Sequence, residues 1–309
     1  MTVPPTVRIA RLARAGTPER WPAAVSPLTA DALQAPPRRA RVLAALPTAL
    51  YLLLPEGHEQ VLPVLAADAL RLPTGLRLAT PSAELAWCVD QGDEVVVGDG
   101  SVRLPRADVV AVRTWRPARV SDGQRDEPRP VDAAGRRATP AALEPVTGAA
   151  VLRELAHDVA LAALLGRTSR VARLVRGLVG AGRGLTPSGD DALCGVLLGL
   201  RATGAPAASR AEVATAVQNS LAATTSLSAS LLLAAASGHA VPEVVELVEA
   251  AVRGDEAATA RALPGVVAIG HSSGADLLAG LAGTLDALCR SDIPTPHNPH
   301  PQPEGARRA

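Results

Sequence analysis

The sequence predicts an α+β protein, with an antiparallel β-rich domain over residues 1–120 followed by an all-helical domain over residues 148–290. Between Arg41 and Val120, short apolar runs are bounded by Gly, Pro and Asp, which is typical of strands and tight turns. After residue 148, apolar residues recur at i, i+3, i+4 and i+7, and several of these segments end in Gly, as helices do.

The strand candidates follow one another with short connections, which favours antiparallel pairing. In chain order they read "ALYLLLPEG", "QVLPVLAA", "GLRLATPS", "ELAWCVDQGD", "EVVVGDG", "SVRLPR" and "DVVAVRTW". The clearest hairpin is "EVVVGDGSVRLP", with Asp99 and Gly100 at its turn.

Residues 121–147 are rich in Pro, Arg and Asp and lack an apolar period, which predicts a linker or a surface loop. The helical segments that follow carry most of the chemistry-bearing motifs. Residues 291–309 form a Pro-rich segment that we expect to be a disordered tail.

Composition limits the core and the possible partners. The chain has 309 residues and is 48% hydrophobic, but it has no Phe, one Tyr and one Met, so Ala, Leu and Val must fill the core. With 26 Gly, this composition suits closely packed helices. All 31 basic residues are Arg and the formal net charge is +1, which argues against a nucleic-acid partner. The absence of Lys also excludes Schiff-base chemistry and a P-loop lysine.

The cellular setting predicted is cytoplasmic. Three widely spaced cysteines fit a reducing compartment, and the first residues show no apolar signal-peptide region. Residues 213–242 contain no charged side chain, but Gln218, Asn219 and many Ser and Thr make a buried helix pair the better interpretation than a membrane span.

The stretch "GAGRGLTPSGDDALCG", residues 180–195, is the strongest motif. It matches neither a P-loop nor GxGxxG. Ser188 as N-cap and Asp191 three residues later would form a capping box. That leaves Asp190 and the glycines Gly182 and Gly184 unexplained. Glycines let the backbone approach a ligand, and a helix N-terminus attracts anions, but paired carboxylates would repel an anion unless they held Mg²⁺, bound an amide or served as a base.

A second passage, "IGHSSGADLLAGLAG" at 269–283, carries the same skeleton S-G-x-D-x-L-x-G. The five matching positions keep one constant offset, and they are Ser188, Gly189, Asp191, Leu193 and Gly195 in the first copy and Ser273, Gly274, Asp276, Leu278 and Gly280 in the second. One interpretation is two capped, closely packed helices. The other is a shared cleft at two helix N-termini. The two interpretations differ on whether residues 184–191 and 270–276 meet.

Hydroxyls and one histidine could complete such a cleft. The segment "ATTSLSAS" is dense in hydroxyls that serve equally well as helix caps, and His271 is a candidate general base. The predicted catalytic residues are Asp190, Asp191, His271 and Asp276, with Asp190 and Asp191 as the ligands if Mg²⁺ binds. The predicted substrate- or anion-binding residues are Gly182, Gly184, Thr186, Ser188, Gly189, Thr224, Thr225, Ser228, Ser273 and Gly274.

Three strings in this order, "GLTPSGDDALCG", "TTSLSASLLLAAASG" and "IGHSSGADLLAG", resemble the bacterial AllH family. The resemblance extends from about residue 51 to residue 289, more weakly in the β-rich part. It implies a subunit of oxamate carbamoyltransferase, acting with an FdrA-like subunit and a third protein in purine and allantoin breakdown. That enzyme exchanges oxalurate and phosphate for oxamate and carbamoyl phosphate. On this view Thr186 and Ser188 donate hydrogen bonds, and Asp190 and Asp191 orient an amide or hold Mg²⁺.

Two other functions remain open from the residues alone. The chain could be a non-catalytic scaffold or interaction subunit whose motifs only cap helices. It could also be a free-standing Mg²⁺-dependent enzyme that acts on a phosphorylated metabolite.

Overall fold

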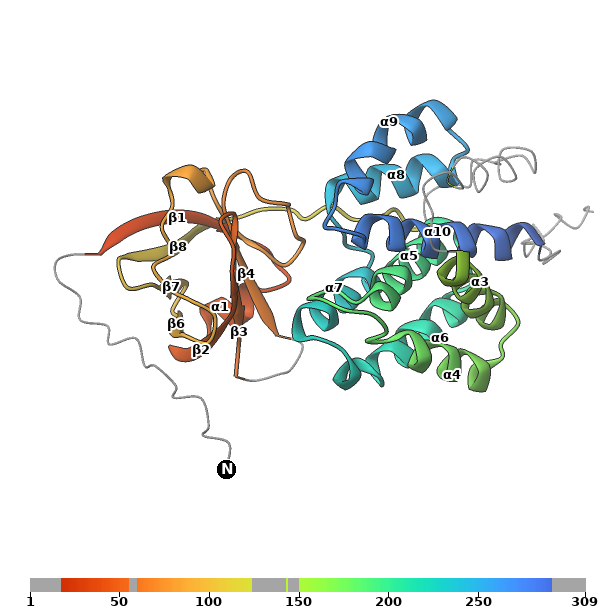
Figure 1. The fold of residues 1–309 in the computed structure, drawn as a ribbon, viewed down its shortest axis with the longest axis horizontal. Helices are drawn as coiled ribbons and strands as arrows, with labels where there is room; N and C mark the ends of the chain where they lie inside the picture. The colour runs from red at the N-terminus through yellow and green to blue at the C-terminus, as the bar shows by residue number, and fades with distance from the viewer. Residues whose placement is uncertain (1–17, 56–59, 124–142, 144–149, 291–309) are drawn as a thin grey trace, which may run out of the picture.

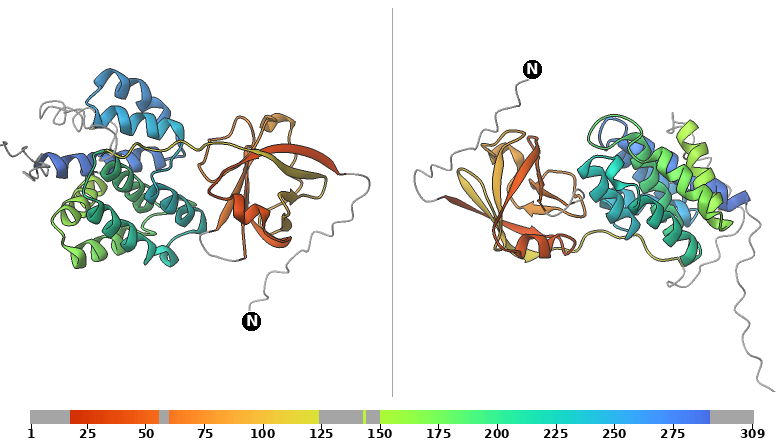
Figure 2. Two further views of the ribbon diagram at one scale, coloured as in Figure 1. Left: turned by 180° about the vertical axis from the view of Figure 1, so that it is seen from behind. Right: turned by 90° about the horizontal axis from the view of Figure 1, so that it is seen from below.

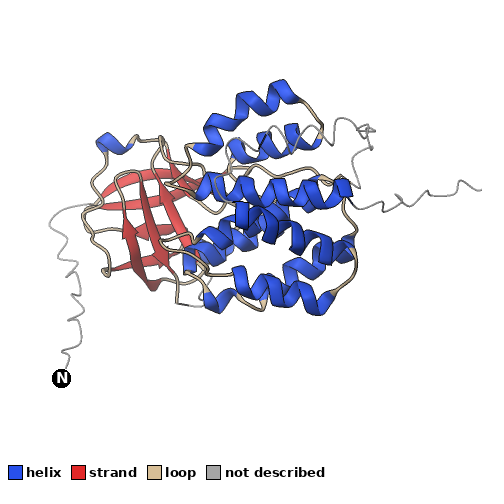
Figure 3. Cartoon of the chain, turned by 45° about the vertical axis from the view of Figure 1, so that its right-hand side comes forward, coloured by secondary structure: helices blue, strands red, loops and turns tan. Residues whose placement is uncertain are grey.

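A computed structural model of the chain describes residues 18–55, 60–123, 143 and 150–290. It confirms the α+β class: a closed eight-stranded barrel comes first in the chain and a set of helices follows (Figure 1). Figure 3 shows the strands gathered on one side of the molecule and the helices after residue 150 on the other.

The barrel has the strand order β1-β5-β4-β3-β2-β6-β7-β8. Its strands are β1 (Glu19–Val25), β2 (Arg38–Ala45), β3 (Ala49–Leu53), β4 (Val61–Leu65), β5 (Leu76–Leu78), β6 (Glu94–Gly98), β7 (Ser101–Arg103) and β8 (Ala107–Thr114). A short helix, α1 (Ala30–Gln34), and a 3-10 turn, η1 (Ser82–Glu84), lie between strands. Most pairs are antiparallel as expected, but β1 pairs with β8 and β4 with β5 in parallel. Closure of the barrel sets the first of these pairings, because it brings the first strand beside the last.

The predicted hairpin at Asp99 and Gly100 is confirmed. Gly98 pairs with Ser101, and both turn residues have positive φ, +50° and +73°, as a type I′ turn requires.

The strand expected in "ELAWCVDQGD" is wrong, because after η1 this segment is a loop. Its apolar residues face the barrel core from the loop: Trp87 and Val89 are buried there, and the Trp87 indole N–H donates to the Leu46 carbonyl. A buried loop therefore produced the apolar pattern of a strand. The strand β1, which contains Pro22, lies outside the region that the pattern marked.

The helices are α3 (Ala150–Leu164), α4 (Thr168–Leu178), α5 (Ser188–Ala202), α6 (Ala207–Gln218), α7 (Ser226–Ala236), α8 (Pro242–Val252), α9 (Glu256–Val267) and α10 (Ser273–Arg290), with a 3-10 turn η3 (Leu221–Ala223). Helix α5 is central, since every residue from Gly189 to Leu200 is buried and the helix packs against α10, α3 and α7. The uncharged segment 213–242 forms the end of α6, η3 and α7, as expected for a buried helix pair. Within the described residues, no helix is long and apolar enough to cross a membrane.

The barrel and the helices share contacts. Arg71, in the connection after β4, pairs with Glu243 of α8 at 3.1 Å, and Leu65 of β4 belongs to the apolar cluster of the helices. The chain after β8 crosses from the barrel to the helices (Figure 2), where the Val120 amide donates to the Gly238 carbonyl. Most of the predicted linker at 121–147 and all of the predicted tail at 291–309 lie outside the described residues.

Candidate functional site

The two copies of the repeated motif begin two neighbouring helices, α5 and α10, which run parallel. A Cβ built on Gly195 would lie 2.2 Å from the Leu277 carbonyl oxygen, and one built on Gly280 would lie 1.9 Å from that of Ala192. The contact is reciprocal, because Leu277 occupies in α10 the position that Ala192 occupies in α5. Only glycine fits at this crossing. One turn later, a Cβ on Gly199 would lie 3.1 Å from the Thr284 methyl group, again at the same offset, so the two helices keep one register along this contact.

The loops before these helices also meet. The Thr186 and Ser273 hydroxyl oxygens are 2.9 Å apart and share a hydrogen bond. Segments 184–191 and 270–276 therefore lie together, as the shared-cleft interpretation requires.

The Asp190 side chain is 1% exposed and has a complete set of partners. It accepts hydrogen bonds from the Gly180 amide at 2.9 Å, from the Ser228 hydroxyl at 2.8 Å, and from the Thr224 hydroxyl. The next hydroxyl, Thr225, caps α7 by accepting from the Ser228 amide at 3.1 Å. Asp190 thus connects Gly180, in the loop before α5, to the start of α7 through hydrogen bonds.

The predicted capping box at Ser188 is wrong. Pro187 is the N-cap residue of α5, Ser188 is its first helical residue, and no side chain caps the helix. Asp191 lies beside the Ser273 and Thr186 hydroxyls, which lower its pKa, instead of closing back on Ser188. The two motifs therefore meet across the helix pair, which local spacing does not reveal.

Asp191 and its counterpart Asp276 are buried, at 7% and 6% exposed. Among the described residues, the Oδ2 atom of each has no hydrogen-bond partner. Burial raises the pKa of Asp191 to about 7; hydrogen bonds from Ser273 and Thr186 lower it, and the charges of Asp276 and Asp190 raise it further. The site therefore holds two unused carboxylate oxygens and one carboxyl group that titrates near neutral pH.

The predicted glycines divide into two groups. Gly182 and Gly184 have positive φ, +130° and +91°, and lie in an exposed loop over the start of α5. Gly189 and Gly274 have a packing role, because a Cβ on either would lie about 2 Å from a carbonyl oxygen of the preceding helix (2.1 and 1.9 Å). Their predicted contact with a ligand stays a prediction.

His271 is exposed and makes no hydrogen bond or ion pair with the described residues, so its role as general base also stays a prediction. Within the part of the chain that the structure describes, no group of three or more His, Cys, Asp and Glu side chains could hold a metal ion. Asp190, one of the two ligands expected if Mg²⁺ binds, is occupied by its three donors.

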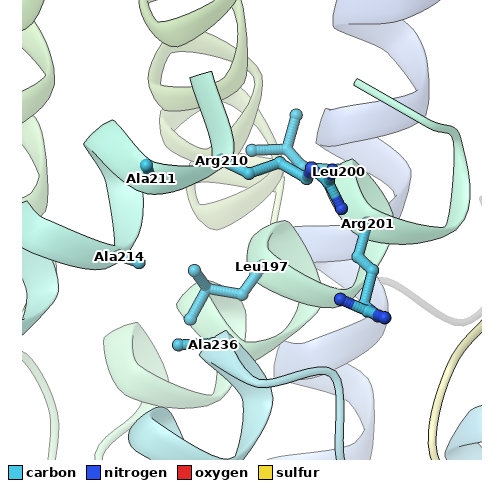
Figure 4. A pocket seen from close by; sticks show the side chains of 7 residues that line it. All are labelled: Leu197, Leu200, Arg201, Arg210, Ala211, Ala214 and Ala236. Atoms are coloured by element: carbon cyan, nitrogen blue, oxygen red, sulfur yellow. The ribbon is translucent and has the colours of Figure 1, made fainter. Parts of the chain in front are cut away.

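A cavity of about 120 Å³ lies at the other end of α5, between α6 and α7 (Figure 4). Arg201 and Arg210 line it, and both guanidinium groups approach Asp122, at 3.8 and 3.1 Å. Sequence reasoning missed this cluster, because its members lie far apart along the chain and form no motif.

The comparisons with known proteins concern this helix pair. No curated protein and no solved structure gives a match to the chain. The family model of oxamate carbamoyltransferase subunit AllH matches residues 178–285, which run from the last residue of α4 into α10 and contain both copies of the repeated motif. Over residues 178–285, the resemblance of this chain to the AllH family is therefore confirmed.

Proposed function

We propose that the chain is a subunit of an oxamate carbamoyltransferase-like complex and that the first turns of α5 and α10 bind the amide end of a small anionic substrate. The observation that carries the proposal is the pair of buried, unpartnered Oδ2 atoms of Asp191 and Asp276 beside the hydrogen-bonded Thr186 and Ser273. The match to the AllH family model supports the assignment to this complex.

The chemistry of the site fits an amide. Ionised carboxylates only accept hydrogen bonds, whereas a primary amide nitrogen carries two donor hydrogens. Asp276, and Asp191 once it has given up its proton, would therefore accept hydrogen bonds from the amide nitrogen of oxamate or of a carbamoyl group. The negative end of the substrate would turn to the hydroxyls of Thr186 and Ser273 and to the positive ends of the two helix dipoles.

Asp191 would also move a proton. When a phosphate oxygen attacks the carbamoyl carbon of oxalurate, the bond from that carbon to the oxamate nitrogen breaks and the nitrogen must gain a proton. Asp191, with its pKa near 7, would donate that proton and regain one from the phosphate. Because the carboxylates are buried, the exposed loop at 181–185 would have to open for substrate to enter.

The remaining expectations complete the proposal. The complex would include an FdrA-like subunit and a third protein, and it would work in the cytoplasm in purine and allantoin breakdown. These assignments rest on the resemblance to the family.

The test is steady-state kinetics of the reconstituted complex, with Asp191→Asn and Asp276→Asn compared with Asp286→Asn. Asp286 lies on the same helix as Asp276 but pairs with Arg153 at 2.8 Å, so it is a matched control. We expect the first two variants to lower kcat by about 10²–10⁴-fold, the range for general acid–base groups, and the control to keep its activity. Size-exclusion chromatography would check that every variant still assembles.

Full activity in both site variants would contradict the proposal and favour a non-catalytic scaffold subunit. Activity of the chain alone that depends on Mg²⁺ would favour the free-standing enzyme instead.

A further inference from the structure

A row of three residues crosses the outer face of the barrel on β5, β1 and β8. Ala24 of β1 pairs with Arg77 of β5 on one side and with Arg113 of β8 on the other. Residues paired directly across strands point to the same face of a sheet. The neighbours of Ala24 in β1, Ala23 and Val25, belong to the barrel core, so this row faces outward.

An irregularity in β8 creates the row. The register between β1 and β8 shifts between Ala23 and Ala24, so that Ala23 pairs with Ala111 and Ala24 with Arg113, and Val112 is left without a partner. In an unshifted ladder, Ala24 would face Val112. The bulge thus places a guanidinium group where a regular strand would place an isopropyl group, which is a common use of bulges beside binding sites.

The row forms the floor of a cavity of about 380 Å³ that Trp115 and Thr114 also line. Strands in a sheet lie about 4.8 Å apart, so the backbones that carry the two arginines are about 10 Å apart, with only the methyl group of Ala24 between them. The Arg77 guanidinium lies over the Trp115 ring, 5.0 Å from its centroid. This stacking restricts the Arg77 side chain before any ligand binds.

The cavity is positively charged. No Asp or Glu lines it, and neither Arg77 nor Arg113 forms an ion pair with the described residues. Burial lowers the pKa of Arg77, and repulsion by the positive charges of Arg71 and Arg113 lowers it further. A negative ligand between them would relieve that repulsion.

We propose that this cavity binds a small oxyanion, a phosphate or a carboxylate, between the guanidinium groups of Arg77 and Arg113. The site lies in the barrel, outside residues 178–285, so it does not depend on the amide site at α5 and α10.

The test is isothermal titration calorimetry of the full chain at low ionic strength, with inorganic phosphate in one arm and oxalate in the other. We expect binding of at least one anion, and whichever binds identifies the ligand class. Arg77→Gln and Arg113→Gln should each weaken binding by about tenfold or more, as expected for loss of a charge-assisted hydrogen bond. Ala24→Val should also weaken it, because the larger side chain fills the floor without changing any charge.

Two controls separate this site from general attraction and from the amide site. Arg41→Gln removes the same charge from β2, an exposed position far around the barrel from β1, and should bind like the wild type. The loss of affinity caused by Arg113→Gln should be the same in an Asp191→Asn background, even if Asp191→Asn abolishes activity of the complex.

Absence of binding with both anions would overturn the proposal. The proposal would also be overturned if Arg41→Gln lost as much anion affinity as Arg77→Gln and Arg113→Gln, or if Ala24→Val bound the anion like the wild type. If neither anion bound and Arg113→Gln instead weakened assembly with a partner subunit, the row would be a protein interface. Because Arg113 is exposed, Arg113→Gln should fold like the wild type, so a loss of binding in this variant would report on the site and not on misfolding.

Discussion

Replacing Asp191 with Asn should make the protein more stable at neutral and higher pH. Asp191 is buried beside Asp276 and Asp190, and burial with these charges raises its pKa from 3.8 to about 7. An amide of nearly the same shape keeps the packing and removes the charge. The substitution therefore isolates the stability that the protein loses when this carboxyl group ionises.

The sign follows from linkage between protonation and folding. The folded state holds the Asp191 proton more tightly than the unfolded state, so this group favours folding fully below its unfolded pKa and loses that contribution as pH rises through about 7. A difference of one pKa unit corresponds to about 1.4 kcal/mol. Between pH 5 and pH 8, the advantage of Asp191→Asn over the wild type should thus grow by about 2–3 kcal/mol.

Urea unfolding of both proteins at several pH values measures this difference directly. Asp286→Asn is the control, because that carboxylate pairs with Arg153 and its removal should destabilise the protein. If the stability difference between Asp191→Asn and the wild type did not change from pH 5 to pH 8, Asp191 would not carry the raised pKa, and the proton-transfer role proposed for it would fail.

Four further predictions concern packing and hydrogen bonding in the helices. Asp190→Ala should cost about 3–5 kcal/mol in urea unfolding at pH 7, because it leaves three donors, one buried and two partly buried, without their acceptor. Gly280→Ala should lower stability by about 1–3 kcal/mol, because its Cβ would lie 1.9 Å from a carbonyl oxygen of α5. By contrast, Gly177→Ala, in a helical position with open space around the new Cβ, should raise stability by about 0.5–1 kcal/mol in the same urea unfolding experiment. A double-mutant cycle of Thr186→Val and Ser273→Ala should give a coupling of about 1 kcal/mol, and additive effects would show that their hydrogen bond contributes nothing.

Local signals in the sequence predicted the fold class and the motif-bearing helices, because helix periodicity and tight turns are encoded by neighbouring residues. The hairpin at Asp99 and Gly100 and the starts of α5 and α10 are of this kind. Local signals failed where an apolar pattern had another cause. Trp87 and Val89 fill the barrel core from a loop, and periodicity alone cannot distinguish such a loop from a buried strand.

The contacts that define the candidate site could not be predicted, because they join distant parts of the chain. Asp190 bonds to Thr224 and Ser228, and only the fold shows that it is a structural tie and not a free acid. Arg77 and Arg113 share a row because of strand register and a bulge, neither of which leaves a sequence signal. The repeated motif S-G-x-D-x-L-x-G was the one long-range relation visible in the sequence, because both helices use the same residues at the same contacts.

Comparison of the two copies also distinguishes the positions of the motif that packing explains from those that it does not. In both copies the leucine, Leu193 or Leu278, is 0% exposed, which packing explains, and Gly195 and Gly280 are required where α5 and α10 cross. Packing does not explain the aspartate of each copy. Each leaves a buried Oδ2 atom without a partner in the described chain, and each such group destabilises the fold. A helix pair selected only for stability would carry a neutral side chain at both positions. Since the two unsatisfied carboxylates lie together at the paired helix starts, their compensating partner is to be sought outside the described residues, and a ligand that brings its own hydrogen-bond donors would supply it.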